Sequence, residues 1–306
     1  MTPLHIKAPW GLGDAIYVRP LLKAAAKQRT LYVDTPWPEF YDDIPNLKFV
    51  LGERLLRTQL KNIRRQPPER WTPLPAGLGT IALGYGHLEM EHGVFAAMER
   101  KLPMTKPEAR APNWDLPDMG PCPFDTGGAP LAVVRPVMRR LEWDNQARNP
   151  LPEYINFVAG DLKRRGFAVV VIADTSNTHN AEWIEGGVPP PHNLARLRGE
   201  GTVNQLMAMV RDAAVVVGGV GWIVPAAIAM KTPTFVVLGG NGGMNAPSKI
   251  IDRRMDGSKI GFATPKDYCQ CIDMRHQCVK LIPDLEKQWR RWASALPRLS
   301  RSSRAA

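Results

Sequence analysis

The alternation of short apolar strands with amphipathic helices is the feature that most limits how this chain can fold. It begins with a strand over residues 4–8, continues through the turn Gly11-Leu12-Gly13-Asp14, and enters a helix whose apolar residues recur at helical spacing. Strands that alternate with helices favour a parallel sheet, because a helix is the usual connection between parallel neighbours. The sequence therefore predicts an α/β fold.

The same pattern starts again in the second half of the chain. Between Pro103 and Pro130 the sequence is irregular and rich in proline, which predicts a linker. Strands are predicted over residues 4–8, 30–34, 47–51, 80–83, 131–135, 167–173, 214–217 and 234–238, and helices around residues 53–65, 155–166, 203–210 and 223–230. A last helix over residues 284–296 is expected to pack back across the N-terminal domain. Two Rossmann-like domains that face a central cleft are the predicted architecture.

The chain carries a formal net charge of +11 at pH 7, which favours an anionic partner such as nucleic acid, phosphorylated glycolipid or a membrane surface. Part of this excess lies in two groups, which can equally be a solvated face and a frayed end: Lys61, Arg64, Arg65 and Arg70, and then Arg290, Arg291, Arg298, Arg301 and Arg304. No apolar run approaches the roughly 18 residues of a membrane span, and Met1 to Trp10 lacks the pattern of a secretory signal. We therefore expect a cytoplasmic protein without a transmembrane segment.

Four stretches of the chain, taken in order and spacing, carry a family resemblance. They are Gly11–Asp14 with Arg19–Leu22, Arg148–Tyr154, Leu197–Gly199 with Ala213–Gly218, and Ala226–Ala229 with Thr232–Gly239. These stretches resemble the opening Gly-Asp turn and Pro-Leu-Leu helix, the Lys-x-Trp-Pro segment, the Leu-x-Gly segment, and the donor-loop helix and strand of family 9 glycosyltransferases. That family includes the heptosyltransferases of lipopolysaccharide core synthesis.

The resemblance implies the GT-B fold and the inverting transfer of a sugar from a nucleotide-sugar donor. It implies an N-terminal acceptor-binding domain over residues 1–110, a linker over residues 111–130, a C-terminal nucleotide-sugar-binding domain over residues 131–283, and a C-terminal helix with a basic tail over residues 284–306. One departure lies at the start of the donor helix, where the family usually has an acidic residue, a glycine and then a histidine. By spacing, the positions of the acid and the histidine are Val220 and Pro225 here, so backbone amides must do more to hold the diphosphate.

Asp14 is the predicted catalytic base, because inverting transfer needs a group that takes the proton of the acceptor hydroxyl. It follows a turn in which Gly11 and Gly13 let a substrate approach the backbone closely. These two glycines and Arg19 are the predicted acceptor-binding residues. An alternative and compatible role for Asp14 is the N-cap of the following helix.

Arg148 is the predicted ligand of the donor phosphates, because a guanidinium binds phosphate oxygens bidentately; its alternative is an exposed surface charge. A second group is predicted to hold the donor through backbone amides, side-chain amides and one aromatic ring: Gly219, Gly221, Trp222, Gly239, Gly240, Asn241, Gly242 and Asn245. The glycine-rich loop in this group follows a buried strand directly, at the sheet edge where α/β proteins bind ligands. Such a loop can equally be only flexible, and Trp222 can equally be a core residue.

Four cysteines in a chain of this length do not predict a disulfide framework. Cys269, Cys271 and Cys278 could form a zinc or cluster site together with His276, and Cys122 lies far away in the sequence. The Cys-x-Cys spacing is tighter than the usual Cys-x2-Cys of a structural zinc site. We therefore expect a structural role without metal, and a nucleotide sugar as the only cofactor.

The leading hypothesis for function is an inverting glycosyltransferase that acts on a polyanionic acceptor. A hydroxylated DNA base is favoured over a lipopolysaccharide core or another glycolipid, and the base would have to leave its stack to reach Asp14. The glycolipid alternative predicts an exposed apolar or amphipathic surface on the N-terminal domain, which a group of aromatic residues could supply: Trp37, Phe40, Tyr41 and Trp71. The rival hypothesis is a non-catalytic nucleic-acid or glycan-binding protein that kept the fold. The sugar, the nucleotide and the oligomeric state stay open.

Overall fold

The first lobe of the molecule is built on a four-stranded parallel sheet. The computed structural model describes residues 2–53, 56–176 and 182–297. The elements of this lobe are β1 (Leu4–Lys7), α1 (Leu12–Ala26), β2 (Leu31–Asp34), η1 (Pro38–Tyr41), β3 (Leu47–Val50), α2 (Arg57–Arg64), η2 (Pro68–Arg70), β4 (Thr80–Ala82), η3 (His87–His92), α3 (Val94–Lys101) and α4 (Lys106–Arg110). The strand order is β3-β2-β1-β4, and every pair is parallel. The predicted strands of this half are confirmed.

The second lobe is built on a six-stranded parallel sheet with the order β12-β11-β10-β5-β7-β9. Its elements are β5 (Leu131–Val134), β6 (Met138–Arg140), α5 (Pro152–Arg164), β7 (Ala168–Ile172), β8 (Glu182–Ile184), β9 (Leu194–Arg196), α6 (Val203–Asp212), β10 (Val215–Gly219), α7 (Ile223–Met230), β11 (Thr234–Val237), α8 (Gly242–Asn245), α9 (Pro247–Ile250), β12 (Ile260–Ala263) and α10 (Leu285–Ala293). Strands β6 and β8 form a separate antiparallel pair. Strands β5, β10 and β11 are wholly buried, as continuous apolar runs between two helical layers should be.

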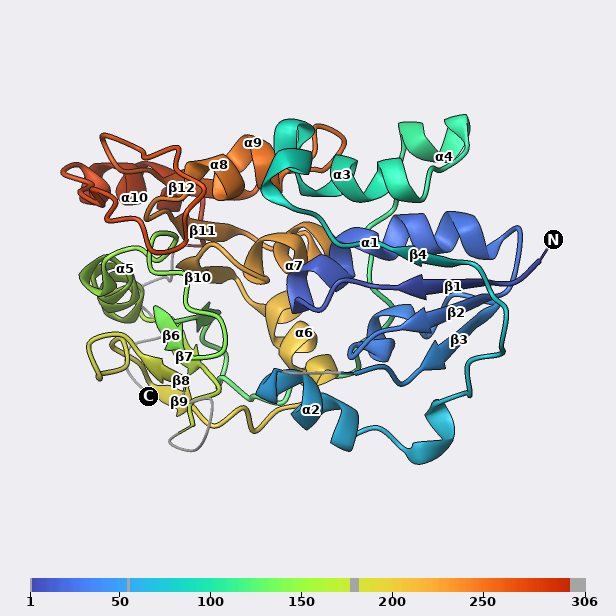
Figure 1. Ribbon diagram of the computed structural model, residues 1–306. Helices are drawn as coiled ribbons and strands as arrows, with labels where there is room; N and C mark the ends of the chain where they lie inside the picture. Colours follow the sequence, from blue (N-terminus) through green and yellow to red (C-terminus); the bar gives the residue numbers. More distant parts are fainter. Residues whose placement is uncertain (1, 54–55, 177–181, 298–306) are drawn as a thin grey trace.

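The two lobes meet where the N-termini of α1 and α7 face each other, in the middle of Figure 1. Gly13 makes this approach possible, because a Cβ atom placed there would lie 3.0 Å from the Cα of Trp222 and 3.1 Å from the Cγ of Pro225. One hydrophobic core continues from the first sheet through this contact to α6, α7 and one face of the second sheet. The lobes therefore share packed surface at this contact.

Two further contacts join the lobes on either side of the helix pair. On one side, Gly93 packs against the backbone of Lys249, and Arg254 forms an ion pair with Glu99 at 2.8 Å. On the other side, α2 reaches the second lobe through two cations that converge on one carboxylate. Arg57 and Lys61 lie 3.0 and 3.1 Å from Asp174. The cleft between the lobes is thus bridged at both ends.

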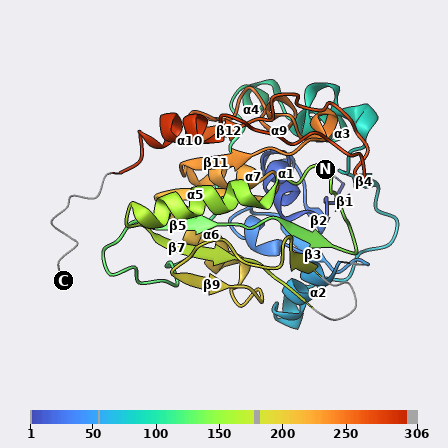
Figure 2. The same ribbon diagram turned by 90° about the vertical axis from the view of Figure 1, so that its left-hand side faces the viewer.

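Helix α10 packs on the second lobe, so the prediction that it crosses the N-terminal domain is wrong. Figures 1 and 2 show it beside α5 and β12. Trp289 is fully buried, its ring lies 5.0 Å from that of Phe235 in β11, and its indole nitrogen donates to Asp161 of α5 at 2.8 Å. The tryptophans of this helix complete the core on the face of the six-stranded sheet that α5 also covers. Without them, part of this apolar face would lack a covering layer.

The sequence prediction of two Rossmann-like units facing a cleft is confirmed, while the boundaries at residues 110, 130 and 283 stay predictions. Residues 111–130 contain neither helix nor strand, as the prolines predict. The described part of helix α2 begins at Arg57, and residues 54–55 of the predicted helix lie outside the described residues. Across residues 2–53, 56–176 and 182–297, no helix has both the length and the apolar character needed to cross a bilayer.

Candidate functional site

A cleft of about 1430 Å3 separates the two lobes and is lined by both. The carboxyl ends of the central strands open into it: Lys7 and Ala82 from β1 and β4, and Arg135 and Val220 after β5 and β10. This is the edge at which open α/β sheets bind ligands. The volume exceeds the roughly 300–1,000 Å3 of a usual small-molecule pocket, so it has room for a donor and an acceptor together.

Eight of the predicted site residues line this cleft, and five do not. Those that line it are Gly11, Gly13, Asp14, Arg148, Gly221, Trp222, Asn241 and Asn245. Those outside its lining are Arg19, Gly219, Gly239, Gly240 and Gly242. The carboxylate of the first lobe and the arginine of the second thus share one cavity.

Asp14 lies in the first turn of α1, where the preceding Gly11 is the N-cap. The interpretation of Asp14 as the N-cap is therefore wrong. Its carboxylate folds back over Gly11, since a Cβ atom there would lie 2.3 Å from Oδ2, and it accepts a hydrogen bond from the Tyr85 hydroxyl at 2.8 Å. Burial in the cleft wall raises the pKa of Asp14, and this effect outweighs the opposing influence of the Tyr85 hydrogen bond and the Arg148 charge. A carboxylate with a raised pKa is a stronger base than a free one.

The opposite wall carries four arginines: Arg135, Arg140, Arg148 and Arg196. Arg140 is neutralised by Glu182 at 3.0 Å, whereas Arg135 and Arg148 have no ion pair in the described part of the chain. The guanidinium of Arg148 lies over the Trp143 ring at 5.5 Å, and its Nε is buried without a partner. Burial and the neighbouring Arg140 lower the pKa of Arg148, and the same causes lower that of Arg135 to about 10, so both stay cationic at neutral pH. Two unpaired cations facing a cleft suit an anion such as a diphosphate.

The N-terminus of α7 lies beside these arginines. A Cβ atom on Gly221 would lie 3.6 Å from the guanidinium of Arg135, and Trp222 is the N-cap of the helix, half-buried between the core and the cleft. Pro225, at the position of the family's histidine, packs against Gly13 and so fills the space between the lobes. Gly219 lies behind this wall, with Pro150 at 3.0 Å from the place of its missing Cβ.

The glycines of the loop after β11 were predicted to bind the donor, but the structure shows that they permit close packing of the chain. Its backbone is packed against two other segments: a Cβ on Gly239 would lie 2.1 Å from the Asn149 oxygen, and one on Gly240 would lie 2.5 Å from the Cys278 sulfur. Gly242 is buried in the same way under Cys269. These three glycines permit chain packing and lie outside the cleft lining, so their predicted role as a cradle for the donor has no support in their placement.

Asn241 and Asn245 reach the cleft from this loop. Asn241 adopts a left-handed backbone conformation with φ of 57° and is fully buried. Its side-chain amide donates to the backbone oxygen of Asp273 at 3.3 Å, and its Oδ1 accepts from Nδ2 of Asn245 at 2.5 Å. The amide group of Asn241 is therefore already engaged with the segment that carries the cysteines.

Arg19 lies inside the first lobe, so its prediction as an acceptor-binding residue is wrong. It is fully buried and forms a bidentate pair with Asp43 at 2.7 and 2.5 Å. The expected apolar surface is also wrong for three of its four residues, because Trp37, Phe40 and Tyr41 belong to the core. Amphipathic patterning could not separate these buried aromatics from exposed ones.

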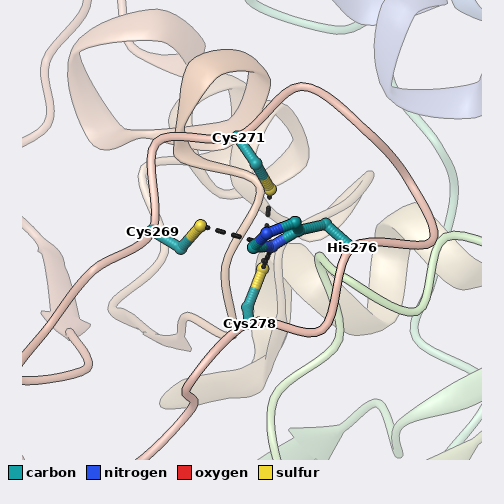
Figure 3. Close-up of side chains that lie close together, drawn as sticks. All are labelled: Cys269, Cys271, His276 and Cys278. Carbon is teal, nitrogen blue, oxygen red and sulfur yellow. Dashed lines mark hydrogen bonds between the residues drawn. The ribbon is translucent and has the colours of Figure 1, made fainter.

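The cysteine stretch brings four candidate metal ligands together (Figure 3). The ligand atoms of Cys269, Cys271, His276 and Cys278 all lie within 4.8 Å of one another. Cys122 is a free thiol in residues 111–130. The prediction that the chain needs no metal stays a prediction, and this arrangement counts against it.

Sequence reasoning missed Arg135, Arg140 and Tyr85. Arg135 was included in the predicted strand over residues 131–135, whereas the strand ends at Val134. A charged residue directly after an apolar run marks the carboxyl edge of a sheet, so the sequence did contain a signal for Arg135. Tyr85 follows β4 in the same way. Arg140 lies in a short antiparallel strand that no local pattern announced.

Two Rossmann-like lobes with a ligand-sized cleft between their sheet edges define a GT-B fold. Among solved structures, the chain is similar to the E. coli ADP-heptose lipopolysaccharide heptosyltransferase II, with a TM-score of 0.50, 12% identity, and coverage of 95% of this chain and 99% of that chain. It is also similar to the iron-containing dodecameric glycosyltransferase TibC from enterotoxigenic E. coli H10407, with a TM-score of 0.53, 16% identity, and coverage of 77% of this chain and 57% of that one.

TibC in complex with ADP-D-β-D-heptose matches with a TM-score of 0.54 at 14% identity, over 81% of this chain and 60% of that chain. The chain thus spans less than two thirds of the length of TibC. No family model and no curated protein matches the sequence. At these identities the similarity shows the fold, which is the heptosyltransferase-like GT-B fold that the sequence resemblance predicted.

Proposed function

We propose that this protein is an inverting glycosyltransferase that uses a nucleotide-sugar donor. The observation that carries the proposal is the placement of the Asp14 carboxylate in one cleft with the guanidinium groups of Arg135 and Arg148, which form no ion pair among the described residues. The structural neighbours support it, since one is described as a heptosyltransferase and another as a glycosyltransferase. We assign the acceptor side to the domain over residues 1–110 and the donor side to that over residues 131–283.

In this mechanism Asp14 accepts the proton of the acceptor hydroxyl while the hydroxyl oxygen attacks the anomeric carbon. The bond between that carbon and the diphosphate oxygen breaks, and the electron pair leaves with the nucleoside diphosphate. Arg135 and Arg148 stabilise the charge on the departing diphosphate, together with the amide groups at the N-terminus of α7. Attack from the face opposite the leaving group inverts the anomeric configuration.

An ADP-linked heptose is the first donor to test. The TibC complex contains ADP-D-β-D-heptose, and heptosyltransferase II is described as an ADP-heptose enzyme. Val220 and Pro225 stand where the family has its acid and its histidine, and both are buried here. Recognition of a nucleotide sugar at this wall must therefore come from backbone amides and arginines, so ADP-heptose is tested beside other nucleotide sugars.

We propose a phosphorylated glycolipid of the lipopolysaccharide core as the acceptor, ahead of the modified DNA base that the charge favoured, because heptosyltransferase II is described as a lipopolysaccharide enzyme. Trp37, Phe40 and Tyr41 are buried, so the proposal does not rest on an apolar surface made by them. Several of the basic residues that favoured a DNA partner bind groups of the same chain. Lys61 pairs with Asp174 at 3.1 Å and Arg290 with Glu286, while Arg65 donates to the Gly199 and Gly201 carbonyls at 2.7 and 2.6 Å. Arg298, Arg301 and Arg304 lie outside the described residues.

Thermal stabilisation with a panel of nucleotide sugars tests the donor site. Because a ligand that binds only the folded state raises its stability, a donor at 100 times its Kd adds about 2.7 kcal/mol to the free energy of unfolding. Absence of a shift with every nucleoside diphosphate and nucleotide sugar would remove the donor proposal. Transfer is then followed by mass spectrometry on core glycolipid and, in parallel, on hydroxylated DNA; sugar on DNA alone would restore the original order of acceptors.

The Asp14→Asn variant separates an enzyme from a non-catalytic binding protein. The amide keeps the size of the side chain but cannot take a proton, so we expect normal donor binding and a loss of turnover of about 10²–10⁴-fold. Equal turnover in the variant would exclude Asp14 as the base. Donor binding without transfer to any acceptor, in the native chain, would favour the non-catalytic hypothesis.

A further inference from the structure

The segment between β12 and α10, residues 264–284, has no helix or strand although it lies against the donor side of the cleft. An irregular stretch of this length is unusual in a compact domain and costs conformational entropy to order. Its internal backbone hydrogen bonds are few, among them Lys266 N–H to Leu281 at 3.0 Å and Cys278 N–H to His276 at 3.0 Å. Something beyond its own backbone must therefore hold it in shape.

The ligand atoms of four side chains of this segment converge within 4.8 Å of one another. Figure 3 shows the sulfurs of three cysteines around the ring of His276. The Nδ1 atom of His276 lies 3.5 Å from the sulfur of Cys269 and 3.4 Å from that of Cys278, and the sulfurs of Cys271 and Cys278 are 3.5 Å apart. With metal–sulfur and metal–nitrogen bonds of about 2.3 and 2.0 Å, a tetrahedral ion sets sulfur–nitrogen pairs about 3.5 Å and sulfur pairs about 3.8 Å apart.

The alternative of a disulfide explains less of this arrangement. Two cysteines would suffice for it, and their sulfurs would be about 2.05 Å apart. Here all three sulfurs and one nitrogen of the imidazole gather at one point, with the cysteines half-buried and the histidine at the surface. Three thiolates and one imidazole are a closed ligand set for zinc and also accept iron.

The same segment holds the glycine-rich loop of the donor side. The backbone N–H groups of Gly242 and Gly243 donate to the carbonyl oxygens of Cys269 and Cys271 at 2.7 and 3.1 Å. Asn241, which lines the cleft, donates to the carbonyl oxygen of Asp273, between Cys271 and Cys278 in the sequence. The conformation of this loop is therefore set by the backbone of the cysteine segment.

It also holds the loop that carries Arg148. The Ala147 N–H donates to the Met274 oxygen at 2.9 Å, and Lys280 donates to the Gln146 oxygen at 2.7 Å. The indole N–H of Trp143, whose ring lies under the Arg148 guanidinium, contacts the Met274 sulfur at 3.1 Å. One irregular segment thus supports both the arginine and the asparagine that face the donor space.

We propose that Cys269, Cys271, His276 and Cys278 bind one zinc or iron(II) ion, and that this ion fixes the segment on which the Arg148 loop and the Asn241 loop rest. The ion is structural, since four protein ligands leave no open position on it. The metal site itself stands on the ligand geometry, while its effect on donor binding rests on the proposed function.

The metal content of the purified full chain tests the site without any activity. Elemental analysis should find about one zinc or iron per chain, and cobalt(II) exchanged into the site should show the d–d bands of a tetrahedral ion and thiolate charge-transfer absorption. Cys271→Ser with Cys278→Ser should lose both signals. Cys122→Ser, which removes a thiol outside the cluster, should keep them. A native chain with no more metal than the double variant, or with a Cys271–Cys278 disulfide by mass spectrometry, would overturn the site.

Histidine variants guard against a cysteine variant that simply fails to fold, because His276 lies at the surface. His276→Ala should weaken metal retention against a chelator by about 100-fold or more, whereas His276→Cys restores a fourth ligand and should retain the ion. The Kd for a bound nucleotide sugar should rise about tenfold in His276→Ala, since binding must then order both loops, and recover in His276→Cys. Metal binding with no nucleotide-sugar binding would contradict the proposed function alone; nucleotide-sugar binding with no metal would contradict the metal site alone.

Discussion

Replacing Arg148 by methionine tests the donor wall and separates binding from folding. The substitution keeps a long unbranched side chain and removes a cation that is buried at its Nε without a partner. The guanidinium lies over Trp143 and near Arg140, with no ion pair in the part of the chain described by the structure. The native protein thus holds a desolvated charge that no ion pair of the described residues neutralises, although the carboxylate of Asp14 acts on it electrostatically.

This environment predicts two opposite changes of free energy, one in the stability of the free protein and one in the affinity for the donor. In the free protein, methionine loses a cation–π contact of about 0.5–1 kcal/mol but no longer buries an uncompensated charge, and exchanging buried charge for apolar side chains is often neutral or stabilising by about 1–4 kcal/mol. In the complex, it loses hydrogen bonds to a charged phosphate of about 1.5–3 kcal/mol, which is about a 10- to 150-fold rise in Kd.

Calorimetric titration with the best nucleotide sugar and thermal unfolding of the free protein measure the two quantities. We expect weaker binding and an unchanged or higher Tm. Arg290→Met is the matched control, because its side chain is 70% exposed and paired only with Glu286 on the same helix. The reasoning would be refuted by a variant that binds donor as tightly as the native chain, or by one that loses stability relative to the control.

Three other expectations concern the catalytic base, the core and the contact between the lobes. Tyr85→Phe removes a hydrogen bond that lowers the pKa of Asp14, so this pKa should rise further and the acid limb of kcat/KM against pH should move to higher pH. An unmoved limb would exclude this contact from the mechanism. Trp289→Ala should lower the free energy of unfolding by about 3–5 kcal/mol in urea titration, whereas the 38% exposed Trp183 should tolerate alanine, and equal losses would contradict the placement of α10. Gly13→Val should reduce stability and donor turnover together, because its side chain would meet the backbone of α7; full activity would show that the lobes need not approach so closely.

The fold was predictable because its signals are local. The strands of the second lobe are mostly continuous apolar runs bounded by turn residues, and the run from Val215 to Gly219 predicts a buried strand without any knowledge of its neighbours. The closing helix shows the limit of such patterns. Its apolar stripe predicts that one face is buried, yet which sheet covers Trp289 depends on Phe235 and Asp161, far away in the sequence.

The site divides in the same way. Asp14 and Arg148 carry charge beside turn signals, so their residue types alone suggested the cleft. The glycines after β11 were ambiguous, because a missing side chain serves close packing of two chains as well as close approach of a ligand. Only the tertiary structure shows Gly240 against Cys278 and brings His276 to the cysteines. The Cys-x-Cys spacing alone did not predict that these four side chains lie close together.

The ion pairs from α2 to Asp174 should make the contact between the two lobes depend on ionic strength, although the transfer reaction itself does not require this. Arg57 and Lys61 are only partly screened from water, with side chains 20% and 31% exposed, so raised ionic strength weakens their attraction to the second lobe. The contact between α1 and α7 is apolar and insensitive to ions. Salt therefore loosens the ion-paired contacts at the ends of the cleft, where Arg254 also pairs with Glu99, while the contact between α1 and α7 stays fixed. The rates of substrate binding and release should change with salt more than the rate of bond making.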